Sequence, residues 1–352
     1  MLFRSLSPLA LLKLLPAESK PNKIVALCTE KATNIFEDFL KREAGIPCEK
    51  VPISEARTES ELWKLLQKIM EEIPEGCDLT LDLTQGLRHF PFLFFTAALY
   101  VRALKKVNIR GAYYGMFEAK VDNASPMVDL SPALDMVNWF QAIQVFRDTG
   151  NAQPLAQCFQ SIEKYEKEGK HPIQESLEDW NMNMGAALPL EVGKSAIQLL
   201  HAIGSEIPGE IRSRIPSSDL LIEHIQGVAA PFSLPEGLEC QGKWKKKIPF
   251  GATELDRQAH LIEFYLEKGH LNNAAGLIRE WMVSRVLLTI SGSDWLNLRN
   301  RRKTERLLHI IRECKKKQEI HPDRKPLSEM WDKICQTRNA LQIGRASCRE
   351  RV

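Results

Sequence analysis

The sequence DLTLDLTQGLRHFPFLFFTAALYVRALKKVNIRGAYYGMF, residues 78–117, reads as a strand, a turn, an apolar helix and a second strand. The β-type run 78–84 leads through a glycine turn into the helical run 90–106, and a β-type pattern returns at 107–114. A helix between two strands is typical of the right-handed crossover that joins parallel strands. This stretch therefore predicts an α/β domain.

The same alternation continues on both sides of this stretch. The flanking predicted strands are 23–28, 48–54 and 126–130, and the flanking predicted helices are 33–45 and 60–73, the second beginning at Ser60. Together they predict one mostly parallel sheet covered on both faces, a Rossmann-like domain. The chain opens on the apolar helical run 9–16, in place of the first strand with which such a domain normally begins.

From about residue 132 the β pattern fades and helical periodicity dominates. The stretch 227–252, with its Pro, Gly and Lys residues, is predicted to be a loop between helices. The predicted organisation is an α/β domain at 1–150 and an all-α domain at 151–343. The last residues, 344–352, carry no helical periodicity and are predicted to be a non-native tail.

Length and composition fit this organisation. A chain of 352 residues is long enough for two domains, and 44% hydrophobic with 26% charged residues is ordinary globular composition. The net charge of +3 favours no class of partner, but residues 291–342 hold 13 Lys and Arg against 7 Asp and Glu. This region would attract a polyanion, although a solvated helical face is the alternative.

The cysteines and the N-terminal residues indicate the cellular compartment of the protein. The 8 cysteines are scattered singly with no CxxC pair, which argues against a zinc site and a disulfide framework and fits the cytoplasm. The apolar run near the N-terminus is interrupted by Lys13, is too short to span a bilayer and lacks a cleavage site. We therefore expect an intracellular protein with no membrane segment.

Candidate ligand-binding residues follow three predicted strands. The carboxyl ends of parallel strands share one edge of a sheet, where helix N-termini and backbone N–H groups bind phosphates. The residues at this edge are Thr29, Glu30, Lys31, Gln85, Gly86, Arg88, Tyr114 and Gly115. Tyr113 and Tyr114 alternate along a strand, so at most one of them faces a ligand. The set suits a phosphate-and-base ligand; a dinucleotide-dependent enzyme is disfavoured because no GxGxxG fingerprint occurs.

Residues 82–88, Asp-Leu-Thr-Gln-Gly-Leu-Arg, resemble the DxTHG signature of the CARF-domain CRISPR proteins. The segments 27–32, 51–63, 73–86, 111–119 and 128–139 resemble that family in order and spacing. The resemblance implies a sensor domain that binds cyclic oligoadenylate across a homodimer, with the tetra-adenylate ring favoured over the hexa-adenylate. It also implies that Asp82 and Thr84 of the motif belong to the ligand-binding residues. Gln85 stands where the family has His, and Gln can also donate and accept hydrogen bonds.

Residues 336–341, Gln-Thr-Arg-Asn-Ala-Leu, resemble the start of the HEPN ribonuclease motif, in which Arg-Asn is followed after three or four residues by His. The resemblance implies that Arg338 and Asn339 are catalytic in metal-independent cleavage of single-stranded RNA. Residues 277–284 resemble the family's earlier helix, so Arg279 and Glu280 would support the site. The motif histidine is absent, because 342–345 read Gln-Ile-Gly-Arg, and we expect impaired catalysis.

The two resemblances together imply a CARF–HEPN protein, an allosteric type III CRISPR effector of antiviral defence. A non-catalytic regulator that senses a cyclic oligonucleotide is the alternative, favoured by the absent histidine. Other groups have weaker cases. Two basic groups are either RNA contacts or solvated faces: Lys245–Lys247, and Arg299, Arg301, Arg302 and Lys303. Four aromatic residues are predicted to belong to the core: Phe90, Phe92, Phe94 and Phe95. Three histidines are predicted to be ordinary packing or surface residues: His270, His309 and His321.

Overall fold

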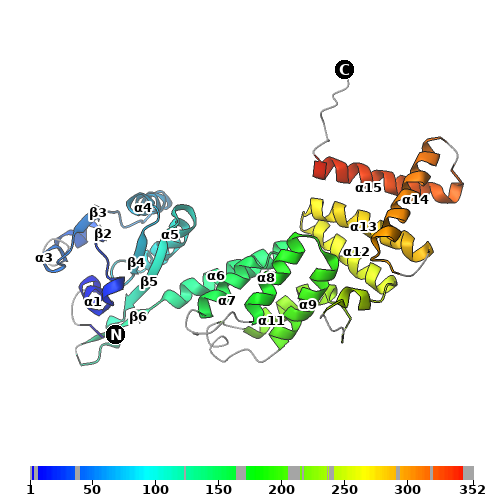
Figure 1. Cartoon of the computed structure of the whole chain (residues 1–352). Coiled ribbons are helices and arrows are strands. Elements are labelled where there is room, and N and C mark those ends of the chain that lie inside the picture. The colour runs from blue at the N-terminus through cyan, green and yellow to red at the C-terminus, as the bar shows by residue number, and fades with distance from the viewer. Residues whose placement is uncertain are drawn as a thin grey trace, which may run out of the picture. The chain divides into compact units, whose positions relative to one another are not determined.

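The computed structural model describes residues 2–3, 7–35, 40–122, 124–163, 172–204, 215, 218–235, 237, 242–290, 294–317 and 320–343. The chain divides into two compact units, Met1–Asp135 and Met136–Val352 (Figure 1). The division falls inside helix α6 (Ser131–Thr149), whereas the sequence placed it at the end of that helix. The predicted tail at 344–352 lies outside the described residues.

The first unit is α/β, as predicted. Its strands are β1 (Leu2–Phe3), β2 (Ile24–Cys28), β3 (Cys48–Pro52), β4 (Asp78–Asp82), β5 (Asn108–Gly115) and β6 (Ser125–Asp129). Its helices are α1 (Ser7–Leu14), α2 (Thr33–Ile35), α3 (Lys41–Glu43), α4 (Glu59–Glu72) and α5 (Phe90–Lys105). Of the helix predicted at 33–45, residues 36–39 lie outside the description.

The prediction of one mostly parallel sheet is wrong, because the strands form two sheets. β2 pairs with β3 in parallel, and a separate sheet has the order β1-β6-β5-β4. In this second sheet β4 and β5 are parallel across the α5 crossover, whereas β5–β6 and β6–β1 are antiparallel. The connection between β5 and β6 is too short for a crossover, which accounts for the antiparallel pairing. The prediction that the chain opens directly on a helix is also wrong, since β1 precedes α1.

The helices α4 and α5 pack on one another through Leu65, Ile69, Phe90, Leu93 and Ala97. α4 begins one residue before the predicted start. Thr58 Oγ1 accepts from Glu61 N at 3.3 Å, and Glu61 Oε2 accepts from Arg57 N at 2.9 Å, a variant of the capping box. On α5 the prediction of a core role is confirmed for Phe90 but wrong for Phe92, which is 73% exposed.

The second unit is helical throughout its described residues, as predicted. Its helices are the main part of α6, α7 (Gln153–Glu163), α8 (Pro172–Gly185), α9 (Pro189–Gly204), α11 (Ser218–Ala229), α12 (Ala252–Glu267), α13 (Leu271–Ile290), α14 (Leu298–Lys316) and α15 (Lys325–Ile343). Its main core forms around fully buried Phe146, Trp180 and Tyr265. Tyr265 Oη donates to Met184 O at 2.7 Å, which joins α12 to α8. None of the helices in the described ranges is long and apolar enough to span a bilayer.

The segment predicted as a loop at 227–252 contributes to a core. Its described part contains short 3-10 turns at Ala230–Phe232 and Trp244–Lys247. Leu234, Trp244 and Ile248 are buried in a cluster with Leu190, Leu287 and Trp295. The described part of this segment between α11 and α12 contains no further α-helix or strand, as predicted for a loop, but three of its side chains are buried in a core. Isolated apolar residues without helical or strand periodicity gave no signal of this packing.

A buried ion pair joins three parts of the second unit. Arg257 Nη2 lies 2.7 Å from Glu254 Oε1, and both side chains are nearly inaccessible, at 7% and 4% exposure. Arg257 Nη1 also donates to Pro189 O at 2.9 Å and to Phe232 O at 3.1 Å. The guanidinium thus holds α12 against the start of α9 and the 3-10 turn at Ala230–Phe232.

We expect Arg257→Met to destabilise the protein strongly, because it leaves the Glu254 carboxylate buried without its partner. The expected cost is about 3–5 kcal/mol. In scanning calorimetry, the unfolding temperature of this unit should therefore fall by roughly 6–20 °C. The double variant Glu254→Gln, Arg257→Met removes both charges and should be less destabilised. A single variant as stable as the exposed control Arg302→Met would contradict this role.

Candidate functional sites

The carboxyl ends of β4 and β5 meet in the first unit and bring three predicted ligand residues together. Thr84 Oγ1 accepts from Gly115 N at 2.8 Å, and Asp82 Oδ1 accepts from Thr84 N at 3.0 Å. The other carboxylate oxygen, Asp82 Oδ2, is buried and has no hydrogen-bond partner in the described part of the chain. Asp82 and Thr84 therefore fix the path of the loop that follows β4.

That loop, residues 83–89, is exposed from Gln85 to His89 and ends at the N-terminus of α5. Gly86 adopts φ +116°, and a Cβ there would lie 3.0 Å from Phe90 Cδ2. Both the backbone conformation and the close approach therefore favour glycine at this position. Arg88 is exposed and pairs with no carboxylate of a described residue, so its charge is available to an anion.

Glu55 joins the two sheets at the same edge, and sequence reasoning missed it. Its Oε1 lies 3.2 Å from Lys31 Nζ, and its backbone oxygen lies 3.0 Å from His89 Nε2. Arg57 Nε also donates to Glu55 Oε2 at 2.8 Å. Arg57, and after it Lys31, lowers the pKa of the Glu55 carboxyl. The carboxylate thus links the end of β2 to the segment after β3, while the backbone contact reaches the start of α5.

The remaining predicted ligand residues of this unit lie around that edge. Thr29 precedes the 3-10 turn Glu30–Ala32, and Glu30 is exposed. Tyr113 packs against the cluster formed by Ala10, Leu11, Leu15 and Met127. Burial, together with the Asp129 charge, raises the pKa of Tyr113. Because side chains alternate along a strand, Tyr114 projects from the opposite face of β5 and is half-buried.

In the second unit, α15 carries the predicted catalytic pair. The helix packs on α13 and α14 through Trp331, which contacts the cluster of Met282, Val283 and Leu308. Arg338 is half-buried, and its Nε is inaccessible and lacks a hydrogen-bond partner among the described residues. Asn339 is exposed and does not line the groove into which Arg338 faces. Of the two predicted catalytic side chains, only that of Arg338 therefore lines the groove.

Arg338 lines a groove of about 580 Å³. Arg279, Glu280, Ser284 and Arg301 line the same groove and come from α13 and α14. The residues predicted to support the site, Arg279 and Glu280, thus share one groove with Arg338. Among the described residues no group of three or more His, Cys, Asp or Glu is placed to hold a metal ion.

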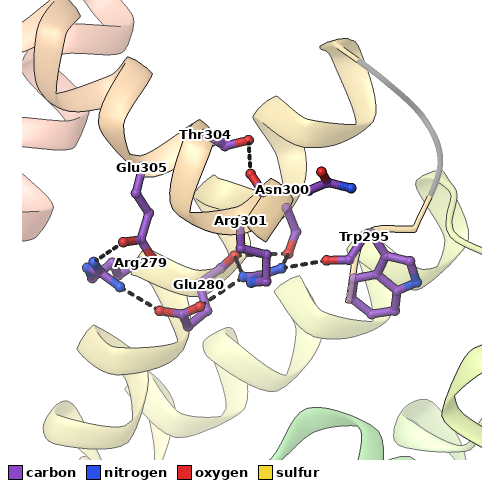
Figure 2. A network of polar contacts seen from close by, with 8 residues as sticks. Arg279, Glu280, Trp295, Asn300, Arg301, Thr304 and Glu305 are labelled. Carbon is purple, nitrogen blue, oxygen red and sulfur yellow. Dashed lines mark hydrogen bonds and ion pairs between the residues drawn. The ribbon is translucent and has the colours of Figure 1, made fainter. Parts of the chain in front are cut away.

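A chain of ion pairs crosses the groove wall, as Figure 2 shows. Glu280 lies between two arginines, with Oε1 at 2.6 Å from Arg279 Nη1 and Oε2 at 2.8 Å from Arg301 Nη2. Arg279 Nη2 also lies 3.3 Å from Glu305 Oε2. Arg301 donates further to Ser284 Oγ at 3.0 Å and to Trp295 O at 3.3 Å. These pairs fix α14 on α13 and commit both arginines to protein partners.

Arg338 is the third arginine of this region and adds positive charge to it. Burial raises the pKa of the Cys335 thiol, and Arg279, Arg312 and Arg338 oppose that rise. Arg279 also lies over the Trp331 ring, with its guanidinium carbon 5.6 Å from the ring centroid. Of the three arginines near Cys335, Arg279 is paired with Glu280 and Glu305, and Arg312 Nε lies 2.6 Å from Asp332 Oδ1, whereas Arg338 has no ion-pair partner among the described residues.

The helix α14 separates the arginines that are adjacent in its sequence. Arg301 turns inward with Thr304 and Leu308, at helical spacing. Arg299, Arg302, Lys303 and Arg306 are exposed on the opposite side. Of the group considered as RNA contacts, Arg301 is therefore part of the groove wall and the others lie on the surface.

The three histidines predicted to be ordinary packing or surface residues have local partners or are exposed. His270 Nε2 lies 2.9 Å from Thr149 O, and His321 Nδ1 lies 3.3 Å from Asp323 Oδ2. His309 is exposed on α14. None of the three lines the groove.

No protein-family model matches this chain. A search of characterised proteins found CRISPR-associated protein MJ1674 of Methanocaldococcus jannaschii, 27% identical over 108 residues. The alignment covers 30% of this chain and 17% of the relative, so the chain matches only a small part of that protein.

Proposed function

We propose that this protein is a CRISPR-associated effector of antiviral defence with two coupled activities. The first unit binds a cyclic oligoadenylate, with the tetra-adenylate ring favoured, and the second cuts single-stranded RNA without a metal. Two chains act together as a cytoplasmic homodimer. The similarity to a CRISPR-associated protein supports the general role, and the two motif resemblances supply the specific chemistry.

The placement of Arg338 is the observation that carries this proposal. Arg338 lines the groove and has no ion-pair partner among the described residues, whereas Arg279 and Arg301 in the same lining are paired with carboxylates. A guanidinium forms strong charge-assisted hydrogen bonds with phosphate oxygens. Arg338 therefore suits a role in binding the scissile phosphate and its developing charge.

The rest of the reaction requires proton transfer. The attacking 2′-hydroxyl must lose a proton, and the leaving 5′-oxygen must gain one, for which histidine is the usual residue. The groove lining holds no histidine among the described residues, and the Glu280 carboxylate is engaged by two arginines. Slow cleavage by this chain follows from that arrangement.

The edge of the first unit supports the sensing activity. The exposed loop around Gly86 permits close approach of a phosphodiester to the N-terminus of α5, and Arg88 supplies an unpaired charge. Tyr114 offers a ring on which an adenine base can stack. For the ligand to activate the second unit, it must bind the active arrangement more tightly than the resting one.

A non-catalytic regulator is the second candidate, because the groove lining lacks a histidine among the described residues. Both candidates require ligand binding by the first unit, whereas only the effector requires RNA cleavage. Titration calorimetry with cyclic tetra-adenylate tests the shared part and should give one ring for two chains. An absence of heat with both the tetra- and hexa-adenylate rings would reject both candidates.

We expect Arg88→Ala to weaken cyclic tetra-adenylate binding roughly tenfold or more, because a charge-assisted contact with a phosphate is lost. Calorimetry measures the change in dissociation constant. Arg42→Ala, on exposed α3, removes the same charge from another part of the unit and should leave binding unchanged. Equal affinities for the two variants would exclude Arg88 from the ligand site.

A further inference from the structure

A second hollow adjoins the groove of the second unit. It measures about 340 Å³, and Glu191 and Lys245 line both it and the groove that contains Arg338. The hollow and the groove are therefore neighbours that share the Glu191–Lys245 ion pair as part of their walls. The other lining residues of the hollow are Asp179, Met182, Asn183, Lys194, Gln198 and Trp244.

Two packed helices and one 3-10 turn build this hollow. Asp179 and Asn183 lie one turn apart on α8, and Glu191, Lys194 and Gln198 follow one another at helical spacing on α9. Trp244 and Lys245 come from the 3-10 turn Trp244–Lys247. Because Trp244 is only 8% exposed and belongs to a core cluster, it holds the turn and its lysine in place.

Two ammonium groups converge on the Trp244 ring. Lys194 Nζ lies 6.0 Å and Lys245 Nζ lies 5.7 Å from the ring centroid. Lys245 is paired with Glu191. Lys194 has no ion-pair partner within 4 Å among the described residues, and Asp179, on α8, is the second carboxylate that lines the hollow. An anionic group bound there would be attracted to both lysines.

We propose that this hollow is a binding subsite for a nucleotide of the single-stranded RNA whose scissile phosphate lies at Arg338. The inference rests on the proposed function and extends it by naming where the RNA chain leaves the groove that contains Arg338. Lys194 and Lys245 contact the phosphate of that nucleotide.

Polar groups of the same hollow suit the base. Single-stranded RNA is recognised mainly through unstacked bases, which hydrogen-bond along their edges. Asn183 Nδ2 already donates to Ser195 Oγ at 2.6 Å, which leaves the Asn183 carbonyl oxygen to accept from a base. Gln198 is exposed and Asp179 is half-buried, and both are within the lining. The hollow thus combines phosphate and base contacts at one place.

The test is fluorescence anisotropy with the full chain and a labelled 2′-O-methyl RNA oligonucleotide, which lacks the attacking hydroxyl and stays intact. The variant Lys194→Gln, Lys245→Gln removes the two hollow lysines. We expect binding on the order of tenfold weaker at low salt. The slope of log affinity against log salt concentration should fall by about 0.7, since the two lysines contact one phosphate and each phosphate contact of a single strand contributes about 0.7.

The matched control is Lys243→Gln, Lys246→Gln, which removes two exposed lysines near the same turn that do not line the hollow. The control should bind as the parent does. Equal binding by the two double variants would overturn the subsite and leave the proposed cleavage site at Arg338 untouched. A parent chain that binds no oligonucleotide at low salt would instead overturn the proposed function and the subsite with it.

A gain of affinity provides an independent check, should the double variant fold poorly. Gln198→Arg adds a positive charge at an exposed position of the hollow on α9. We expect it to bind the same oligonucleotide severalfold more tightly than the parent. Unchanged or weaker binding in a variant whose thermal unfolding matches the parent's would also overturn the subsite.

Discussion

A histidine introduced by Ile343→His is expected to raise the rate of RNA cleavage by about 10²–10⁴-fold, the usual contribution of a positioned general acid or base. The HEPN motif that residues 336–341 resemble has its histidine at this spacing from Arg-Asn, and here the position is occupied by isoleucine. Arg338, the residue proposed to bind the scissile phosphate, already lines the groove. The missing function is proton transfer, which one imidazole can supply near neutral pH.

The measurement is the initial rate of cleavage of a labelled single-stranded RNA in the presence of cyclic tetra-adenylate. Gly344→His is tested in parallel, because the motif allows one further residue before the histidine. Ile343→Gln is the matched control, polar at the same position but unable to act as a base near pH 7. If both histidine variants were no faster than this control, the assignment of the HEPN site would be wrong.

Removing Arg338 from the histidine-restored chain is expected to lower that rate by about 10²–10³-fold, the effect of losing one donor that stabilises transition-state charge. Arg338→Ala would remove the guanidinium that lines the groove, whereas Arg338→Lys would keep the charge but lose the planar donor geometry. We therefore expect the lysine variant to retain an intermediate rate.

Lys333→Ala is the control for this experiment, since it removes a positive charge from an exposed position on the same helix. Calorimetric binding of cyclic tetra-adenylate should be the same for all these variants, which separates loss of catalysis from loss of activation. Full activity in Arg338→Ala would show that the groove is not the site of cleavage.

Local sequence patterns predicted the elements of the first unit but not how its strands pair. The crossover through α5 was readable because the apolar helix and its flanking strands are contiguous in sequence. The separation of β2 and β3 into their own sheet depends on pairing between distant segments, for which periodicity carries no information. The exposure of Phe92 could not be predicted either, because the apolar residues 90–95 occupy every side of the helix and periodicity does not mark one buried face.

The candidate sites divide in the same way. The motif resemblance singled out Arg338, whereas the contacts of Glu55 with Lys31 and of Glu305 with Arg279 arise from tertiary packing between separate segments. One signal was available but not used. Arg301, Thr304 and Leu308 follow helical spacing, which would have placed Arg301 on the inner face of α14, apart from its charged neighbours.

The most direct test of messenger-controlled cleavage is the rate at which the Ile343→His chain cuts single-stranded RNA with and without cyclic tetra-adenylate. We predict slow cleavage without the ring and a rate at least tenfold higher at saturating ring concentration, since allosteric coupling is typically worth 5–150-fold. The same rate in both conditions would contradict the proposal that the first unit controls the second.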